Sequence, residues 1–260
     1  MPTPLIQLEP SEIQRFTKPH VSRDDIHAIL QFKPRNLDFY RRALVHKSVL
    51  RLIKYLDPNK VPKYMIESNE RLEFLGDSVL GLITADFLYK KFPDKDEGFL
   101  TTIRSKLVNT NALSNFAEKL GLEQHILMSK HLQRLDKRNK INMLENAFEA
   151  LIGAIYEDTN LEYARKFILN VFSTFVDWET LLIDTNYKDQ MLRFCQTKKL
   201  SQPEYEVVST SGPAHDRSFV VQVLIGGEVY GKGEKKQKQA AEQSAARQAL
   251  INLTGGKLTK

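Results

Sequence analysis

Residues 69–81 read Asn-Glu-Arg-Leu-Glu-Phe-Leu-Gly-Asp-Ser-Val-Leu-Gly, and this stretch places three acids in a segment that is otherwise apolar and helix-patterned. Glu70, Glu73 and Asp77 are three and four residues apart, so they share one face of a helix. Burying carboxylates without a partner is very unfavourable, and a divalent cation is a common compensation for a group of acids. The spacing therefore predicts a helix with a metal-binding face.

A second stretch, residues 145–156, repeats this design and reads Glu-Asn-Ala-Phe-Glu-Ala-Leu-Ile-Gly-Ala-Ile-Tyr. Asn146 and Glu149 lie three residues apart among apolar neighbours. The alternative is that the acids of both stretches line solvated stripes of amphipathic helices, where most surface acids are found. Bulky apolar residues surround the acids on most sides, so we favour two core helices that carry oxygen ligands.

The two stretches resemble the signature of the ribonuclease III family, endonucleases specific for double-stranded RNA. The resemblance rests on Glu-Arg-Leu-Glu-Phe-Leu-Gly-Asp at 70–77 and on Phe-Glu-Ala-Leu-Ile-Gly-Ala-Ile-Tyr at 148–156. Three further stretches follow the family's order: Ala-Leu-Val-His-Lys-Ser at 43–48, Asp-Glu-Gly-Phe-Leu-Thr at 96–101 and Arg-Ser-Lys-Leu-Val at 104–108. The resemblance implies an all-α endonuclease domain over about 25–182.

The resemblance also implies a set of catalytic metal ligands: Glu73, Asp77, Asn146 and Glu149. We expect catalysis to depend most on Glu149. Carboxylate oxygens suit Mg²⁺, with Mn²⁺ as a substitute, and no small-molecule cofactor is expected. A cation so held can activate a water for in-line attack and offset charge on the leaving 3′ oxygen. Nothing in the chain suggests a protein nucleophile.

Asn146 departs from the family's pattern, because most members have Asp at this position. An amide still offers a carbonyl oxygen to a metal, but it brings no negative charge and cannot act as a base. Some fungal members of the family also have Asn there and remain nucleases. The other explanation is an engineered or degenerate change. The amide weakens the prediction of metal binding without removing it.

Other positions match supporting roles. Glu70 and Glu97 correspond to acidic positions near the family's site, so we expect them to bind a second, weaker metal or to hold waters and basic side chains. For Glu97 a solvated loop or a helix N-terminus is an equal alternative. His46 follows an apolar run, and we expect it to be a core or supporting residue rather than a general base.

Phe74 would be assigned to an ordinary core on spacing alone, whereas the resemblance implies that it packs across a dimer interface. A chain with one nuclease domain carries one acidic cluster and cuts one strand, yet processing of a duplex needs two cuts. A two-fold homodimer supplies two identical sites at a fixed offset. A staggered double cut with short 3′ overhangs would follow.

A second unit begins near Asn186. Residues 186–196 have the spacing of a short amphipathic helix, and strand-like runs follow at 205–208, 218–224 and 228–233. The Ala-rich residues 239–253 predict a last helix, which Gly255-Gly256 stop. This α-β-β-β-α order resembles the double-stranded RNA-binding domain, a small α+β fold.

The resemblance implies three contacts with RNA. Gln190 on the first helix and the loop residues Pro213, Ala214 and His215 would face successive minor grooves, and Lys235, Lys236 and Lys238 would meet phosphates. Such a domain reads form rather than sequence, since the deep major groove of duplex RNA hides the base edges. Gln239 stands where the family has a second lysine, so the basic patch is expected to shift by about a turn. A solvated helix face is the alternative for these lysines.

The composition agrees with a polyanionic partner, because the 260 residues carry a formal net charge of +6. No apolar run predicts a membrane span, and residues 1–10 lack the pattern of a secretory signal. We therefore expect no membrane partner and an intracellular, cytoplasmic protein, with the nucleus or an organelle as alternatives. The single cysteine, Cys195, excludes intrachain disulfides.

The expected organisation is an extension at 1–24, the catalytic domain at 25–182, a linker at 183–185, the RNA-binding domain at 186–256 and a tail at 257–260. The predicted function is metal-dependent hydrolysis of double-stranded RNA to 5′-phosphate and 3′-hydroxyl products in RNA processing. One alternative, supported by Asn146, is a non-cleaving structural or ribosome-associated protein that binds double-stranded RNA. Another is a helical domain whose acids are purely structural.

Overall fold

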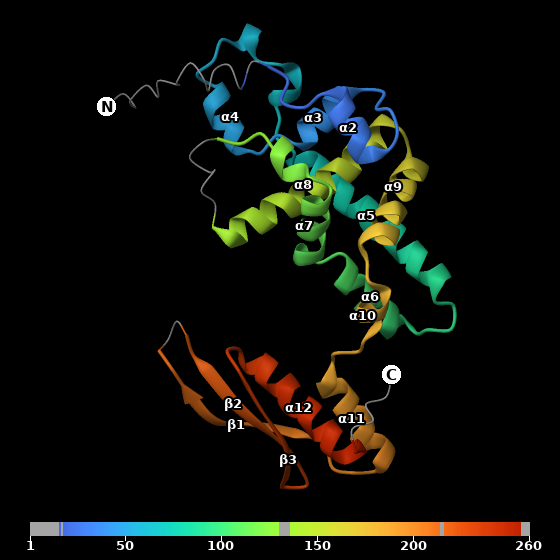
Figure 1. Ribbon diagram of the computed structural model, residues 1–260, viewed down its shortest axis with the longest axis vertical. Coiled ribbons are helices and arrows are strands. Elements are labelled where there is room, and N and C mark those ends of the chain that lie inside the picture. Colours follow the sequence, from blue (N-terminus) through green and yellow to red (C-terminus); the bar gives the residue numbers. More distant parts are fainter. Residues whose placement is uncertain (1–15, 17, 130–135, 214–215, 256–260) are drawn as a thin grey trace. The chain divides into compact units, whose positions relative to one another are not determined.

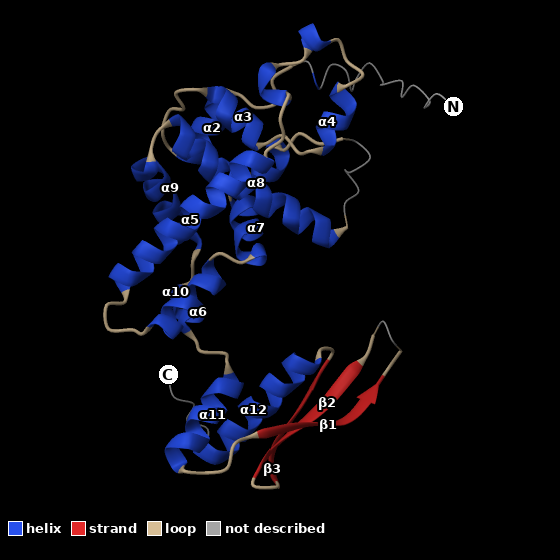
Figure 2. Ribbon diagram, turned by 180° about the vertical axis from the view of Figure 1, so that it is seen from behind, coloured by secondary structure: helices blue, strands red, loops and turns tan. Residues whose placement is uncertain are grey.

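The structure is a computed structural model that describes residues 16, 18–129, 136–213 and 216–255. The chain divides into two compact units, Met1–Leu181 and Leu182–Lys260. In its described residues the first unit is helical, and the second combines a three-stranded antiparallel sheet with two helices (Figures 1 and 2). This is the fold class that the sequence predicts.

The helices of the first unit are short except for two of 22 residues, α5 and α8. Their bounds are α2 Arg23–Leu30, α3 Leu37–Ala43, α4 Ser48–Ile53, α5 Glu70–Lys91, α6 Glu97–Leu107, α7 Thr110–Lys119, α8 Lys137–Asp158, α9 Leu161–Phe175 and α10 Trp178–Leu182. Short 3₁₀ turns lie at Pro58–Lys60, Lys63–Met65 and Leu122–His125. Side-chain caps fix where several helices begin, as at Asp136, whose carboxylate accepts from the Asn139 amide at 2.8 Å.

The core of this unit is built around the crossing of α5 and α8 (Figure 2). From Ala147 to Ile155 every residue of α8 is buried, and α3, α7 and α9 pack around it. A helix that is apolar on nearly all sides must lie inside a domain. The few polar side chains on α8 are therefore held where water has little access.

The end of α8 is tied to the start of α3 by one buried carboxylate. Asp158 accepts hydrogen bonds from the main-chain amides of Arg35 at 2.8 Å and Asn36 at 2.6 Å, and from the Tyr40 hydroxyl at 2.8 Å. A buried acid is stable when donors satisfy it in this way.

The second unit consists of α11 Tyr187–Lys198, β1 Glu204–Ser211, β2 Ser218–Ile225, β3 Glu228–Lys235 and α12 Lys238–Thr254. The strands lie in the order β1-β2-β3. One face of β2 buries Val221, Val223 and Ile225 against four buried alanines of α12 and against Met191 and Cys195 of α11. Because alternate strand residues point to opposite faces, this apolar series fixes the register of the sheet. Gly255, at φ 62°, ends α12 in the left-handed conformation that glycine favours.

Candidate active site

Two glycines bring the backbones of α5 and α8 together. A Cβ atom added to Gly76 would overlap the main-chain oxygen of Glu149, and one added to Gly153 would overlap the main-chain oxygen of Leu72. No residue with a side chain fits either position without moving a helix. This close approach brings the part of α5 that carries Glu73 and Asp77 next to the part of α8 that carries Asn146 and Glu149. The sequence shows both glycines, but their role becomes visible only when the helices are paired.

Glu73 and Asn146 meet across this crossing. Both residues are half-buried, and Glu73 Oε2 is buried without a hydrogen-bond partner among the described residues. Burial and the charge of Glu70 raise the pKa of Glu73, and the charge of Lys47 opposes them. An ionised carboxylate with one unsatisfied buried oxygen is a group that a cation would stabilise.

Glu149 is the most deeply placed acid of the site, with 9% of its surface exposed. Within the described parts of the chain its carboxylate has no hydrogen bond or ion pair. Burial raises its pKa to about 8, and the charges of Asp77, Glu145 and Glu73 add to the effect of burial. Asp77 itself is exposed, so the group runs from solvent at Asp77 to the interior at Glu149.

Glu145 belongs to the same group, although sequence reasoning did not select it. It is half-buried, and burial and the charge of Asp77 raise its pKa. The available signal was its position four residues before Glu149, which puts both on one face of a helix.

Glu70 lies at the edge of this group and has its own partners. Its carboxylate pairs with Lys47 Nζ at 3.0 Å and accepts from the Ser68 hydroxyl at 2.9 Å. These two contacts lower the pKa of Glu70. His46 is half-buried with Nδ1 2.9 Å from the Ser48 hydroxyl, and burial lowers its pKa.

Glu97 lies elsewhere within the unit. It is the first residue of α6, where its carboxylate accepts from the Thr101 hydroxyl at 3.0 Å. It lines a hollow between α5 and α6 together with apolar side chains such as Leu82 and Tyr89. The structure therefore brings Glu70 close to Glu73 but leaves Glu97 apart from the acids at the crossing.

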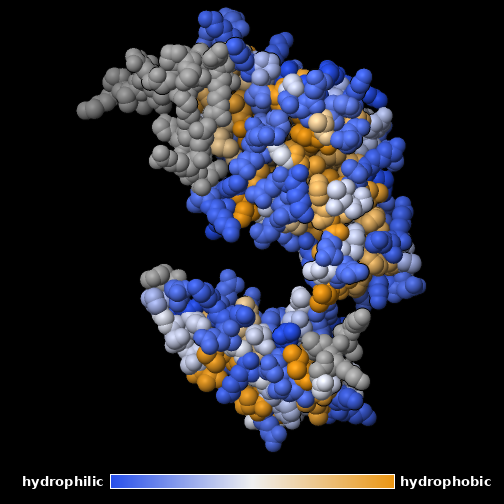
Figure 3. Space-filling view, in the orientation of Figure 1, coloured by the Kyte–Doolittle hydropathy of each residue, from blue (hydrophilic) through white to orange (hydrophobic). Residues whose placement is uncertain are grey.

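Phe74 is on the outer side of α5 with 78% of its surface exposed. Leu82 and Tyr89 on the same helix are 57% and 72% exposed. Figure 3 shows apolar patches around α5 and α9 on a largely hydrophilic surface. Spacing alone would place Phe74 in the core. In the structure Phe74 is exposed, because α5 packs on α8 through another face, which includes Leu72 and Gly76.

The donor set at the crossing suits a hard divalent cation. The side chains of Glu73, Asp77, Asn146 and Glu149 all offer oxygen, as Mg²⁺ and Mn²⁺ prefer, and the unsatisfied Glu73 oxygen and unpaired Glu149 fit such an ion. Over the described residues, no three His, Cys, Asp or Glu side chains already stand at the spacing of a ligand set. Like charges repel, so the carboxylates stand apart and would have to close around an ion.

The second unit carries the lysines expected to meet phosphates. Lys235, Lys236 and Lys238 are all exposed between the end of β3 and the start of α12. Lys236 pairs with Asp216 at 2.5 Å, Lys238 is 4.0 Å from Glu242, and Lys235 has no ion pair within the described residues. Pro213 is exposed at the end of the β1–β2 hairpin, whereas Ala214 and His215 lie outside the described residues.

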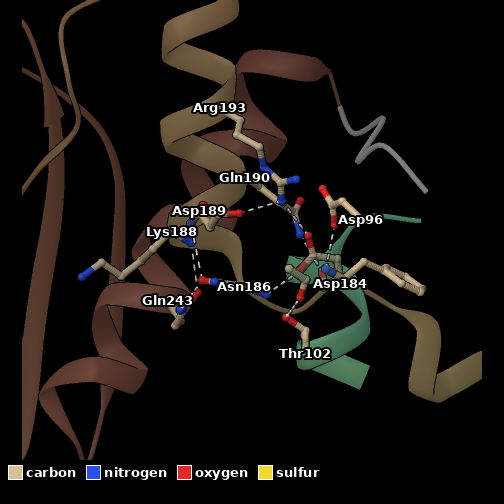
Figure 4. A network of polar contacts seen from close by, with 11 residues as sticks. Asp96, Thr102, Asp184, Asn186, Lys188, Asp189, Gln190, Arg193 and Gln243 are labelled. Atoms are coloured by element: carbon tan, nitrogen blue, oxygen red, sulfur yellow. Dashed lines mark hydrogen bonds and ion pairs between the residues drawn. The ribbon is translucent and has the colours of Figure 1, made fainter. Parts of the chain in front are cut away.

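Gln190 is held by a polar network at the start of α11 (Figure 4). Its side-chain amide donates to the main-chain oxygen of Asp184 at 2.7 Å, and Arg193 pairs with the Asp184 carboxylate at 3.1 Å. Asn186 accepts from the Gln243 amide at 3.0 Å, which joins α11 to α12. To donate to RNA, the Gln190 side-chain amide would therefore have to give up its hydrogen bond to the Asp184 main-chain oxygen.

Comparisons with known proteins agree with both units. A family model described as Ribonuclease-III-like matches residues 36–174, and the double-stranded RNA binding motif matches residues 187–253. The chain is 38% identical over 232 residues to Ribonuclease 3 of Chlorobaculum tepidum, covering 89% of this chain and 83% of the relative. It is 32% identical over 231 residues to Ribonuclease 3 of Listeria innocua, covering 89% of this chain and 97% of the relative.

One solved structure supports the fold of the first unit. The nuclease domain of Ribonuclease III from Campylobacter jejuni matches with a TM-score of 0.50 at 31% identity, covering 59% of this chain and 97% of that domain. Together the matches define a ribonuclease with a double-stranded RNA binding motif. The chain belongs to the ribonuclease III family, whose members cleave double-stranded RNA. The predictions of family, fold class and hydrolase activity are confirmed. None of the described helices is long and apolar enough to cross a membrane.

Proposed function

We propose that this chain is a divalent-metal-dependent endonuclease that cuts double-stranded RNA to 5′-phosphate and 3′-hydroxyl products with short 3′ overhangs, in RNA processing. The observation that carries the proposal is the group of acids at the α5–α8 crossing. Its innermost member, Glu149, is buried without a partner among the described residues, which is unfavourable unless a cation joins it.

Glu73, Asp77, Asn146 and Glu149 would hold the cation, Mg²⁺ or Mn²⁺. When bound, it would supply an activated water and offset charge on the leaving 3′ oxygen. Asn146 would offer its side-chain oxygen to the cation beside Glu73. The glycine-lined crossing keeps the two acid-bearing faces at a fixed separation. Glu70 lies beside Glu73, where it would hold waters or a weaker second ion, with Lys47 as its counter-charge.

The second unit would grip the duplex by its shape. Lys235, Lys236 and Lys238 are exposed and positively charged, which suits contact with phosphates. Gln190 and the hairpin loop from Pro213 to His215 would enter minor grooves. Phosphates would compete with Asp216 for Lys236, because that ion pair is itself exposed.

The chain would act as a homodimer through the outer side of α5. Phe74, Leu82 and Tyr89 are all exposed on α5. Large apolar side chains that cluster on a surface usually mark an interface with another protein. The matched Campylobacter jejuni nuclease domain is described as having a region involved in dimer formation. Two copies would bring two sites to the two strands of one duplex. Glu97, on the hollow beside Tyr89, would then face this interface or the RNA near it.

The test is cleavage of a long labelled RNA duplex by the full chain with Mg²⁺ or with a chelator. We expect cutting with Mg²⁺, none with chelator, and a loss of about a thousandfold or more in Glu149→Gln, because the variant removes a ligand charge. Glu157→Gln is the matched control, since Glu157 is an exposed acid on the same helix. The 5′ and 3′ ends of the products are identified by phosphatase treatment and ligation.

Two results would contradict the proposal. Cutting that continues in chelator would remove the metal requirement. Binding of duplex RNA without cutting by this chain would favour the non-cleaving RNA-binding protein. If only Asn146→Asp then cut, the amide would be the cause of the lost activity.

A further inference from the structure

The residues just before α11 fold back onto that helix (Figure 4). The main-chain oxygen of Asp184 accepts from the Gln190 side-chain amide at 2.7 Å, and the Asp184 carboxylate pairs with Arg193 at 3.1 Å. The other oxygen of this carboxylate accepts from the Asn186 main-chain amide at 2.9 Å, which closes a turn before the helix. Asp184 is therefore held on α11 at three points, and all of these residues belong to the second unit.

Asp184 occupies the side of α11 that is expected to meet RNA. Gln190 and Arg193 are three residues apart, so they lie on one side of the helix. In the proposed function Gln190 enters a minor groove, which phosphates border on both edges. The Arg193 side chain is 61% exposed, and a planar guanidinium with several donors matches the oxygens of a phosphate. Arg193 is therefore placed to bind the RNA backbone beside the groove that Gln190 would enter.

The charges on this side of α11 oppose RNA while Asp184 is in place. Arg193 Nη2 lies 3.1 Å from the Asp184 carboxylate and 2.8 Å from the Asp189 carboxylate. Two carboxylates thus face one guanidinium, and the three side chains together are net negative. Asp189 belongs to α11 and stays with it, whereas Asp184 precedes the first residue of the helix and is free to leave. Departure of Asp184 would remove the net repulsion of phosphates.

The contact between Asp184 and Arg193 is weak enough for RNA to replace it. The two side chains are 45% and 61% exposed, and an ion pair in such a place is screened by water and salt. A duplex that also contacts the lysines of this unit gains further phosphate contacts and releases counterions, which an isolated acid on the same chain does not do.

We propose that Arg193 is a further RNA-binding residue and that Asp184 is an internal competitor for it, which duplex RNA displaces when it binds α11. The inference rests on the proposed function, because it concerns the same RNA-binding helix. Asp184 makes the second unit more selective: a small polyanion that meets Arg193 alone does not displace the acid, whereas a duplex that engages α11, the hairpin loop and the lysines together does.

The experiment measures binding of a fluorescent RNA duplex to the full chain by anisotropy, in chelator so that metal-dependent cutting does not occur. Asp184→Asn removes the charge but keeps an oxygen for the Asn186 amide. We expect this variant to bind about three- to fivefold more tightly, because an exposed ion pair no longer competes with RNA. Glu179→Gln is the matched control, since it makes the same change of charge at an exposed acid of α10, and it should stay within about 1.5-fold of the parent.

A double variant separates competition at Arg193 from a general change of charge. Arg193→Gln should weaken duplex binding about twofold in the parent, where Asp184 holds the guanidinium. In the Asp184→Asn background the same substitution should weaken binding about fivefold or more, because Arg193 is then free to contact RNA. Thermal unfolding of each variant checks that stability is kept, which a change confined to exposed side chains predicts.

The proposal is overturned if Asp184→Asn binds the duplex as Glu179→Gln does, or more weakly, or if Arg193→Gln has the same effect in both backgrounds. If the parent chain binds and cuts duplex RNA while the variants give these results, this inference alone fails. If the parent chain does not bind duplex RNA, the proposed function fails and this inference fails with it.

Discussion

In both units, glycines allow two elements to pack closely. Acids lie beside this contact in the first unit, and lysines lie beside it in the second. In the first, Gly76 and Gly153 let α5 and α8 touch along their backbones. In the second, Gly231 and Gly233 of β3 let α12 lie directly on the strand, because a Cβ atom at Gly233 would meet the Ala241 oxygen and the Ala245 amide. Helix meets helix in one case and strand in the other, and small residues make both contacts possible.

The difference lies in where the charges stand relative to each contact. The first contact has acids beside it that range from exposed Asp77 to buried Glu149, so their repulsion and the desolvation of the inner ones are a lasting cost to stability. The second has lysines at its end, exposed to solvent, where their charge costs little. In the proposed function the acids act on one bond and lie partly out of water, whereas the lysines that would meet phosphates lie in solvent.

The largest stability effect is expected at the crossing of the first unit. Gly76→Ala should lower the free energy of unfolding by about 3 kcal/mol or more, because the new methyl group overlaps the backbone of α8 and the helices must separate. Gly81→Ala is the matched control on the same helix, since no described atom lies within 4 Å of its added Cβ. That control should gain about 0.5 to 1 kcal/mol from helix propensity. Chemical denaturation measures both, and equal effects would show that the helices are not in close contact.

A somewhat smaller effect is expected at the corresponding contact of the second unit. Gly233→Ala should destabilise this unit by about 2 to 3 kcal/mol, since α12 must move away from β3. Duplex RNA binding should weaken with it, while Mn²⁺ binding should stay unchanged because the acids belong to the first unit. Thermal unfolding measures the loss of stability, and a separate titration measures Mn²⁺ binding. Loss of Mn²⁺ binding in this variant would mean that the two units do not fold independently.

Removing the exposed charges should change binding without changing stability. Lys235→Ala, Lys236→Ala and Lys238→Ala together should weaken duplex binding about 10- to 100-fold at 0.1 M salt and reduce the salt slope by about two to three. The free energy of unfolding should stay within about 0.5 kcal/mol. Lys198→Ala, an exposed lysine at the end of α11, is the control and should change neither quantity much. Titration of a fluorescent duplex at several salt concentrations gives the slope.

The smallest effect is a gain in stability at the acid group. Glu149→Gln should stabilise the metal-free protein by about 1 to 2 kcal/mol at pH 8, because the roughly 4 kcal/mol that a pKa of about 8 costs the ionised acid is partly offset by burying a glutamine amide without a partner. The native state holds this proton more tightly than the unfolded state, so the cost is absent below pH 4.5 and grows up to pH 8. The stability difference between variant and parent should therefore grow with pH in chelator. A difference that is constant with pH would show that Glu149 is not the group that titrates.

The sequence predicts the fold of both units because their patterns are local. The acids at 70, 73 and 77 and the apolar residues around them are set by helical periodicity, and the hairpin turns of the second unit are marked by glycines. What the sequence does not predict depends on pairing between elements. Glu145 became part of the site only when α5 was laid against α8, and Gln190 proved to be bonded to Asp184 only when α11 was placed. The outward position of Phe74 likewise depends on which face of α5 meets α8.

The carboxylate of Asp158 has a consequence for how the site is kept in order. Three donors from residues 35–40 hold Asp158 in the last turn of α8. Asp158 lies more than two helical turns beyond Glu149 along the chain. Contacts so far apart in sequence form late in folding, because a long loop must close first. The helix that carries Asn146 and Glu149 is therefore anchored at its far end by residues 35–40 of its own unit. Loosening that anchor would let α8 slide along its axis, so that hydrogen exchange at residues 35–40 would report on the alignment of the site itself.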